Sequence, residues 1–206
     1  MFTGIIEQFG TIEKIETLPF GKRFFIKNDI ESLRIGDSIA VNGVCFTVTT
    51  LDARLISVEA SPETLAKTTM SNLSLKEHVH LELPVSLSKP LGGHFVTGHV
   101  DEVLRIASIE SFDAFRRYVF EGITQPQWIC CKGSITVDGV SLTINRLVSS
   151  NSIECMLIPH TLKNTRFNTL KTHDAVNVEY DYLAKIVARQ HAVRQDAAEL
   201  TFSEET

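Results

Sequence analysis

Apolar and β-branched residues come in short runs through the first 60 residues, separated by glycine, asparagine and aspartate. The runs at 24–26, 38–41, 45–50 and 55–58 are rich in valine, isoleucine, phenylalanine and threonine, which is typical of β-strands. Between the second and third runs stands Asn42-Gly43, a pair that readily supplies the positive φ angles of a tight turn. The pattern predicts an antiparallel hairpin at this point.

The pattern then changes from strand to helix. Ser61-Pro62 marks a helix start, because serine caps free backbone N–H groups and proline loses nothing at the first helical position. We expect a short helix ending at about Ser71. An alternating strand follows at 78–83, and two prolines and a glycine pair make 84–93 the predicted linker.

The same order of elements recurs after the linker. Residues 137–145, Val-Asp-Gly-Val-Ser-Leu-Thr-Ile-Asn, repeat residues 41–49, Val-Asn-Gly-Val-Cys-Phe-Thr-Val-Thr, at an offset of 96 (137 − 41). Such a repeat is too long for a solenoid unit and indicates a duplicated β domain, of the kind that closes into a Greek-key barrel. Further matching blocks begin, in the same order, at Thr3 and Thr97, Ser38 and Ser134, Pro62 and Pro159, and Val79 and Val176.

The tail from Ala184 to Leu200 has no counterpart in the repeat. Its apolar positions fall three and four apart, which predicts a helix with an apolar stripe. The helix either packs back on its own barrel or joins subunits, and its attachment to two complete domains favours the second. Residues Thr201 to Thr206 are expected to fray. The stripe consists of Leu183, Ile186, Val187, Gln190, Val193, Ala197 and Leu200.

Composition narrows the class of protein. The net charge of -5 and the scattered basic residues argue against nucleic-acid or anionic-membrane binding. No apolar run reaches the length of a bilayer span, and Glu7 follows the first residue too soon for a signal peptide. The four cysteines form neither C-x-x-C nor a disulfide framework, which fits a reducing compartment. We expect a cytoplasmic protein whose partners are small molecules or other proteins.

One histidine pair resembles a metal site only superficially. His78 and His80 would share a strand face, but no carboxylate or cysteine accompanies them at ligand spacing. A solvated strand face is the preferred interpretation, and no metal is predicted.

The two copies differ in chemistry after the hairpin turn. Cys45 in the first copy corresponds to Ser141 in the second, and each shares a strand face with a threonine two residues later, Thr47 or Thr143. Such a face suits a polar ligand and carries a potential nucleophile. A small buried cysteine and a turn serine are the alternative.

Two further differences add ionisable groups to the second copy. Asp138 replaces Asn42 in the turn, although aspartate serves a turn equally well. His99 replaces Ile5 and adds a group that titrates near neutral pH, unless it is a packing residue.

Four stretches together resemble the riboflavin synthase family, over residues from Met1 to about Asp181. The family likeness implies a mainly β fold of two tandem homologous six-stranded Greek-key β-barrels, each with a short helix, and a C-terminal α-helix. The stretches are 1–7 (Met-Phe-Thr-Gly-Ile-Ile-Glu), 42–47, 92–101 (Gly-Gly-His-Phe-Val-Thr-Gly-His-Val-Asp) and 138–143.

The resemblance also implies an organisation and an activity. Barrels at 1–90 and 91–183 would bind lumazine, and 184–206 would form the oligomerisation helix and tail of a homotrimer with active sites between subunits. Two molecules of 6,7-dimethyl-8-ribityllumazine would exchange a four-carbon unit, giving riboflavin and 5-amino-6-ribitylamino-2,4-pyrimidinedione, with no cofactor. An association with lumazine synthase is left open.

By the same resemblance, residues of the family's two pockets map onto this chain. The expected first-barrel set is Gly4, Ile5, Ile6, Cys45, Phe46, Thr47, Glu59, Ser61 and Thr64. The expected second-barrel set is Gly98, His99, Val100, Lys132, Ser141, Leu142, Thr143, Ile158 and Thr161, with Asp181 in addition.

The catalytic step needs a base for the C7 methyl group of one lumazine and a nucleophile or water for the other. The sequence does not assign these roles. His160, opposite Glu63 of the first copy, departs from an acidic position of the family. The catalytic candidates are Ser141, Cys45, His99, Asp138 and Thr143, with Phe2 shaping the pocket.

Two other functions compete with this interpretation. A non-catalytic lumazine or flavin antenna protein of the same fold would lack the polar set of the second barrel. A flavin reductase would need an α/β nucleotide domain, for which the chain has neither G-x-G-x-x-G nor room.

Overall fold

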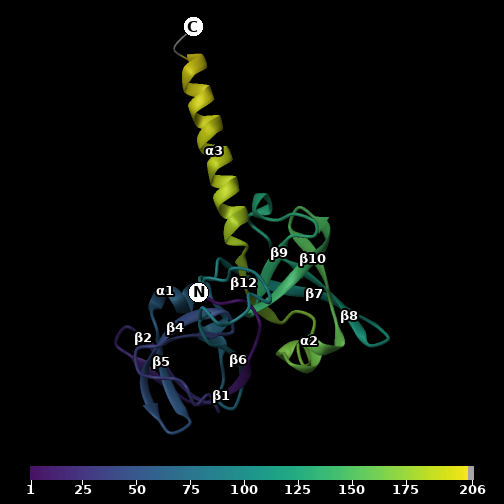
Figure 1. Cartoon of the computed structure of the whole chain (residues 1–206). Helices are drawn as coiled ribbons and strands as arrows, with labels where there is room; N and C mark the ends of the chain where they lie inside the picture. The colour runs from purple at the N-terminus through teal and green to yellow at the C-terminus, as the bar shows by residue number, and fades with distance from the viewer. Residues whose placement is uncertain (204–206) are drawn as a thin grey trace.

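Two closed β-barrels form the body of the protein in the computed structural model, which describes the backbone of residues 1–203 and the surroundings of side chains up to residue 194 (Figure 1). All strand pairs are antiparallel, and the two barrels have the same cyclic order of neighbours, β1-β2-β5-β4-β3-β6 and β7-β8-β11-β10-β9-β12. The predicted duplication and fold class are therefore confirmed. The first barrel consists of β1 (Gln8–Leu18), β2 (Gly21–Lys27), β3 (Ser38–Val41), β4 (Val44–Asp52), β5 (Leu55–Ala60) and β6 (His78–Glu82). The second consists of β7 (Glu102–Phe112), β8 (Phe115–Glu121), β9 (Ser134–Val137), β10 (Val140–Ser149), β11 (Ser152–Leu157) and β12 (Ala175–Tyr180).

The predicted hairpin is present in both barrels. In the first, Val41 pairs with Val44, and the turn residues Asn42 and Gly43 have φ angles of 45° and 80°. These are the left-handed values that a two-residue hairpin turn requires. Along β4 the side chains then alternate, so that Phe46 faces the barrel core while its two neighbours face outward. The hairpin thus fixes which side chains are available to a ligand.

The predicted helix after the hairpin is split in two. Ser61 caps α1 (Pro62–Lys67) by accepting a hydrogen bond from the backbone N–H of Thr64, as expected. The helix stops at Thr68, whose extended backbone lets its hydroxyl cap the 3₁₀ helix η1 (Thr69–Asn72). The second barrel repeats this arrangement in α2 (Pro159–Lys163) and η3 (Arg166–Asn168), and it carries one further 3₁₀ helix, η2 (Pro126–Trp128).

The two hairpin turns meet at the junction between the barrels. A Cβ atom added to Gly43 would lie 2.6 Å from the backbone nitrogen of Gly139, so only glycine permits this approach. Around this point the two copies make equivalent hydrogen bonds. The N–H of His80 donates to Oδ1 of Asn42, and the N–H of Asn177 donates to Oδ1 of Asp138.

His80 is part of this junction, and the predicted solvated position is wrong for it. The side chain is only 1% exposed. Its Nδ1 lies 2.8 Å from the carbonyl oxygen of Asp138 and must donate to it, so Nε2 accepts the N–H of Arg166 at 2.6 Å. Burial lowers its pKa to about 3. Neutral His80 therefore links the two barrels, whereas His78 remains exposed.

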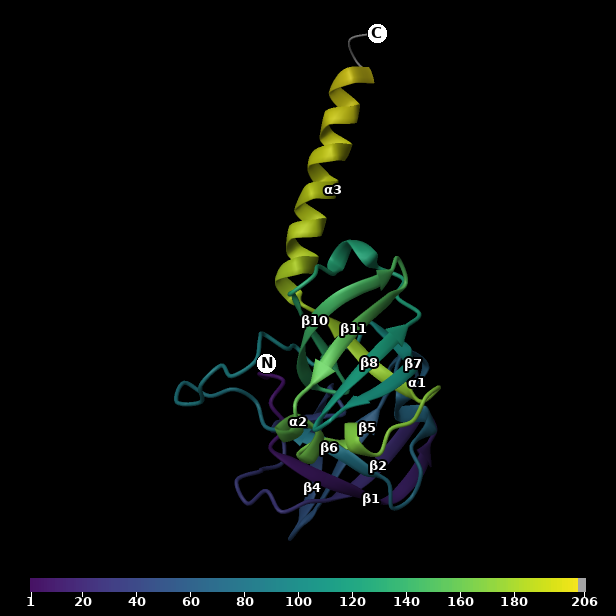
Figure 2. The same ribbon diagram turned by 90° about the vertical axis from the view of Figure 1, so that its right-hand side faces the viewer.

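The helix α3 (Tyr182–Ser203) projects away from both barrels (Figures 1 and 2). Near its first turn, Lys185 pairs with Asp101 at 2.5 Å and lies over the ring of Trp128. The helix does not lie back along its barrel, and Leu183 and Val187 are more than half exposed. Among the described residues, no helix combines the length and hydropathy of a membrane span. The backbone of residues 201–203, predicted to fray, continues α3. The surroundings of Ala197 and Leu200, and residues 204–206 of the predicted frayed end, lie outside the described residues.

Candidate active site

Each barrel receives a short segment that is anchored on the other barrel. The N–H of Ser141 in β10 donates to the carbonyl of Gly4 at 2.7 Å, and the N–H of Cys45 in β4 donates to the carbonyl of Gly98 at 2.8 Å. The segments are joined where Phe2 pairs with Val96 as an isolated antiparallel bridge. The residues before β1 therefore complete a surface of the second barrel, and those before β7 complete a surface of the first.

Glycine is required at both crossing points. Gly4 has a φ angle of +78°, and a Cβ atom there would lie 2.6 Å from Cβ of Ser141. Gly98 has a φ angle of +82°, and its Cβ would lie 2.5 Å from Cβ of Cys45. A side chain at either position would be strained by the backbone conformation and would also collide with the strand beneath it.

A buried glutamate holds each crossing segment in place. Glu82, at the end of β6, accepts hydrogen bonds from the N–H and hydroxyl of Thr3 and from the N–H of Gly4. Glu179, in β12, makes the three equivalent bonds to Thr97 and Gly98, at 2.6–2.8 Å. Three donors compensate a carboxylate for its lost hydration. The repeat contained a signal for this pair, because the matching blocks 79–82 and 176–179 end on Glu82 and Glu179.

The expected residues form two clusters, but the grouping by sequence halves is wrong. Gly4 and Ile6 were expected beside Cys45, and they lie against the second barrel, where Ile6 packs on the core. Val100 was expected beside Ser141, and it packs on the core of the first barrel. The cause is the crossing of the two segments, which similarity between the halves does not reveal.

The Cys45 cluster surrounds a cavity of about 240 Å³. Burial raises the pKa of the Cys45 thiol, so the side chain is a neutral thiol at physiological pH and a weak nucleophile. Ser61 lies beside the cavity, with its hydroxyl 3.0 Å from that of Thr64. Of the lining residues, Val44, Glu63, Lys67 and Thr68 were not expected from the sequence, whereas Cys45, Thr64, Gly98, His99 and Val100 were.

The Ser141 cluster contains a histidine that the sequence did not single out. Nδ1 of His94 lies 2.7 Å from Oγ of Ser141, and Nε2 lies 3.0 Å from Oγ1 of Thr136. Burial lowers the pKa of His94, which favours the neutral ring. The only sequence signal was the position of His94 within the 92–101 stretch.

Asp138 does not join the Ser141 cluster, contrary to expectation. It is 1% exposed, and its Oδ1 accepts from the N–H of Asn177 within the junction between the barrels. Burial raises its pKa to about 6. The turn that carries Asp138 points toward the other barrel, so proximity in sequence to Ser141 does not bring the carboxylate to the same surface.

Phe46 and Leu142 were expected in the pockets, but their side chains belong to the barrel cores. Only their backbone groups can reach a ligand. The adjacent Thr47 and Thr143 are exposed, and they share the outer faces of β4 and β10 with Cys45 and Ser141, as the alternation predicted.

The remaining expected residues lie around the two clusters. Glu59 is engaged by Arg23 at 2.6 Å. Ile158 is about half exposed at the start of α2, where it replaces the capping serine of the first copy. Asp181 accepts from the N–H of Leu183 at the start of α3. Phe2 is fully buried and packs beside Cys45. The carbonyl of Thr161 accepts a hydrogen bond from the hydroxyl of Thr165. Four further expected residues are exposed: Ile5, His99, Lys132 and His160.

Comparison with known proteins defines the class first. The sequence model of the lumazine binding domain family matches this chain twice, over residues 3–84 and 97–181. The solved structure of LumP in complex with 6,7-dimethyl-8-(1'-D-ribityl) lumazine has the same fold, with a TM-score of 0.79 and 24% identity over 87% of this chain and 98% of LumP. The protein is thus a double lumazine-binding-domain protein.

Sequence relatives define the family more closely. The chain is 38% identical to riboflavin synthase of Bacillus amyloliquefaciens over 99% of this chain and 96% of that protein. It is 39% identical to riboflavin synthase of Bacillus subtilis over 92% of this chain and 89% of that protein. A third relative, riboflavin synthase of Brucella abortus, is 38% identical over 92% of this chain. The chain belongs to the riboflavin synthase family.

Proposed function

We propose that this protein is a riboflavin synthase, a transferase that moves a four-carbon unit between two molecules of 6,7-dimethyl-8-ribityllumazine. The products are riboflavin and 5-amino-6-ribitylamino-2,4-pyrimidinedione. Donor and acceptor are the same compound, so no external oxidant or reductant enters the balance. The observation that carries this function is the pair of equivalent clusters around Cys45 and Ser141, built on one backbone plan with different chemistry.

Each cluster would hold one lumazine. Hydroxyl groups on the outer face of each strand suit the polar ribityl chain, and backbone groups along the strand edges suit the pyrimidine ring. In this proposal Ser141, Thr143, Cys45 and His99 contact the reacting molecules, and Phe2 shapes the pocket from below, through the buried apolar cluster on which Cys45 packs. The resemblance also places Lys132, Ile158, Thr161, Glu59 and Asp181 among the binding residues.

The two bound lumazines must approach closely for carbon transfer. Holding both rings in register replaces a bimolecular encounter by reaction within one complex, which supplies a large part of an enzymatic acceleration. Hydrogen-bond donors around the anion formed from the C7 methyl group supply another part. The unlike surroundings of Cys45 and Ser141 would make one molecule the donor and the other the acceptor.

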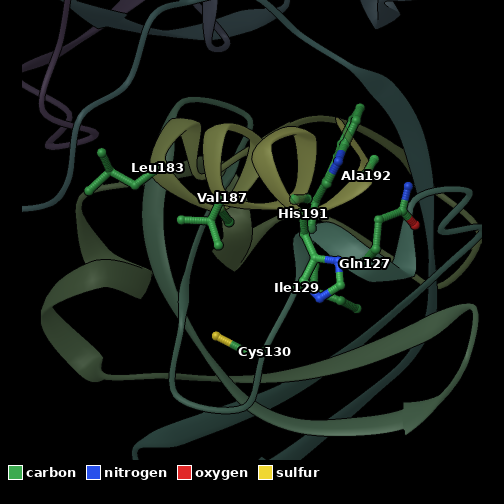
Figure 3. Close-up of a pocket in the computed structure, with 10 residues that line it drawn as sticks. Gln127, Ile129, Cys130, Leu183, Val187, His191 and Ala192 are labelled. Atoms are coloured by element: carbon green, nitrogen blue, oxygen red, sulfur yellow. The ribbon is translucent and has the colours of Figure 1, made fainter. Parts of the chain in front are cut away.

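We further propose a cytoplasmic homotrimer, divided into barrels at 1–90 and 91–183 and a tail at 184–206, with the active site between subunits. An apolar cavity of about 620 Å³ between η2 and α3 supports a subunit interface here. Figure 3 shows Leu183 and Val187 of α3 beside it, together with Ile129 and Cys130. Sedimentation of the whole chain at the mass of three subunits is expected, and a monomer would contradict this assembly. An association with lumazine synthase stays a prediction.

The activity is tested with purified protein and 6,7-dimethyl-8-ribityllumazine alone. Riboflavin is expected to form, with two molecules of lumazine consumed for each molecule produced, as followed by absorbance and chromatography. Stable binding of the lumazine without turnover would contradict the enzyme and identify an antenna-type carrier instead.

A further inference from the structure

His94 lies between two hydroxyl groups in the second barrel. Its Nδ1 is 2.7 Å from Oγ of Ser141, and its Nε2 is 3.0 Å from Oγ1 of Thr136. The ring is 8% exposed, and Thr136 is buried beneath it. The backbone N–H of His94 donates to the carbonyl of Thr3, which fixes the main chain as well. The imidazole therefore has little freedom to turn away from Ser141.

A neutral imidazole has one donor and one acceptor nitrogen, so two hydrogen-bond arrangements satisfy this cluster. In one, the hydroxyl of Thr136 donates to Nε2, and Nδ1–H donates to Ser141, whose own proton is then free to point at a ligand. In the other, Nε2–H donates to Thr136, and Ser141 donates to Nδ1, which leaves oxygen lone pairs facing the ligand. The state of the ring decides whether Ser141 is a donor or an acceptor.

The first barrel has no such arrangement among the described residues. The position equivalent to Thr136 is Ala40, at the same offset of 96 that relates the two hairpins (136 − 40). Ala40 is buried in an apolar cluster with Phe2 and Val96, on which Cys45 packs. The difference between the two clusters thus extends below the surface that a ligand touches.

We propose that His94 is a positioning residue that sets the hydrogen-bonding role of Ser141 toward the lumazine in the second barrel, with Thr136 as its second support. This inference rests on the proposed function, because it assumes that Ser141 contacts the substrate. Burial lowers the pKa of His94, and the Asp181 carboxylate opposes this effect. Below the pKa of the ring both nitrogens are donors, and Ser141 loses the arrangement in which it donates to Nδ1.

Three substitutions separate this role from a packing role. His94→Phe keeps a ring but removes both bonds, and kcat is expected to fall about 100-fold, within the range typical of positioned proton donors and acceptors. Thr136→Val is nearly isosteric, and a fall in kcat of about 10-fold is expected with KM changed less than about 3-fold. His94→Asn should recover activity to within about 10-fold of the wild type, because an amide, like a neutral imidazole, has one donor and one acceptor group. The junction between the barrels shows this exchange: Asn177 accepts the N–H of Thr69 and donates to the carbonyl of Asn42, where the other copy uses His80. Thr50→Val, which removes a hydroxyl bond to Ser57 far along β4, serves as the matched control with unchanged kcat.

The decisive readout is the pH profile of kcat, measured from about pH 4.5 to 8, a range that extends well below the ordinary histidine pKa of about 6.5 because burial lowers the pKa of His94. The wild type is expected to lose activity toward acid pH, and His94→Asn is expected to lose this dependence because an amide does not titrate. In His94→Phe, the additional change Ser141→Ala should cost little, since the two residues act as one unit. An unchanged acid limb in His94→Asn, together with additive losses in the double variant, would overturn the proposal. Failure of the wild type to turn over would instead contradict the proposed function.

Discussion

The surroundings of Cys45 and Ser141 share a backbone and differ in side chains. Both residues follow the same hairpin turn, donate their N–H to a glycine carbonyl, and lie beneath a segment held by a buried glutamate. Below the surface, however, Ser141 continues into His94 and Thr136, whereas Cys45 packs on an apolar cluster. We therefore expect the duplicated hydrogen bonds to position a bound lumazine and the unduplicated side chains to determine how it reacts.

The largest expected effect comes from breaking the shared backbone plan. Gly98→Ala places a Cβ atom 2.5 Å from Cβ of Cys45 on a residue with a φ angle of +82°. We expect the free energy of unfolding to fall by about 3–4 kcal/mol, with loss of activity. Thermal and denaturant unfolding measure the change.

Gly36→Ala is the matched control for this substitution. Gly36 has a φ angle of +92°, but nothing lies within 4 Å of an added Cβ atom. The loss there should be only about 1–2 kcal/mol, which is the backbone contribution alone. Equal losses at both glycines would show that the close crossing of the segments is not a constraint.

Asp138→Asn makes the second turn chemically equal to the first, which has Asn42. Burial raises the pKa of Asp138 to about 6, so the native state binds a proton more tightly than the unfolded chain, whose value is near 3.9. Wild-type stability therefore falls as pH rises from about 4 to 6. At neutral pH the variant should be more stable by about 3 kcal/mol, and near pH 4 the two should be equal.

Urea unfolding at several pH values tests this expectation, with Asp113→Asn on the exposed β7–β8 turn as the control. Activity of the variant should remain within a few-fold of the wild type, because the carboxylate lies in the junction between the barrels. A loss of activity with unchanged stability would return Asp138 to the catalytic residues.

Asn177 occupies the position of His80 in the second barrel, where its Oδ1 accepts the N–H of Thr69 and its Nδ2 donates to the carbonyl of Asn42. The substitution His80→Asn copies this arrangement. The pKa of His80 is lowered to about 3, so the unfolded chain binds the proton more tightly than the native state. The contribution of neutral His80 to the free energy of unfolding is thus fully present above about pH 6.5 and is lost as the pH falls toward 3. Acidification from pH 7 to 5 is expected to cost the wild type about 2 kcal/mol from this residue.

Between pH 7 and 5, His80→Asn should therefore lose about 2 kcal/mol less free energy of unfolding than the wild type loses. His78→Asn, at the exposed histidine of the same strand, is the control and should leave the pH dependence unchanged. If the wild type and His80→Asn showed parallel pH curves, His80 would not be held neutral in the junction.

The smallest effect is expected at the surface of the first cluster. Cys45→Ser gives the first barrel the side chain of the second, but without a histidine below it. We expect kcat to change by less than about 3-fold, since the neutral thiol is not an activated nucleophile. The reciprocal variant Ser141→Cys should lose considerably more, because it disturbs the bond to His94. Steady-state kinetics on both variants distinguish the clusters, and equal losses would remove the distinction.

Local features of this fold could be predicted from the sequence. The Asn42-Gly43 turn, the cap at Ser61 and the repeat all act through neighbouring residues or simple similarity, and all are present. The long first strand of each barrel was missed. In β1, the charged residues of the exposed face and a bulge between Ile12 and Lys14 interrupt the alternation that signals a strand.

The site depended on contacts between distant parts of the chain, which similarity between halves does not encode. Gly4 lies on Ser141 because the first segment crosses to the other barrel, and no local pattern marks that crossing. The same holds for His80. Its position in the strand predicts which face its side chain lies on, but not that the second barrel covers that face. His94 was missed because its partners are 42 and 47 residues away.

The crossing segments have a genetic consequence. A change at position 4 alters the surroundings of Ser141, and a change at position 98 alters those of Cys45, so each half of the gene encodes part of the other half's pocket. Compensating mutations for a defect in one cluster should therefore be sought in both halves. The two copies have diverged in their side chains, but the crossing segments keep each copy physically part of the other's surroundings.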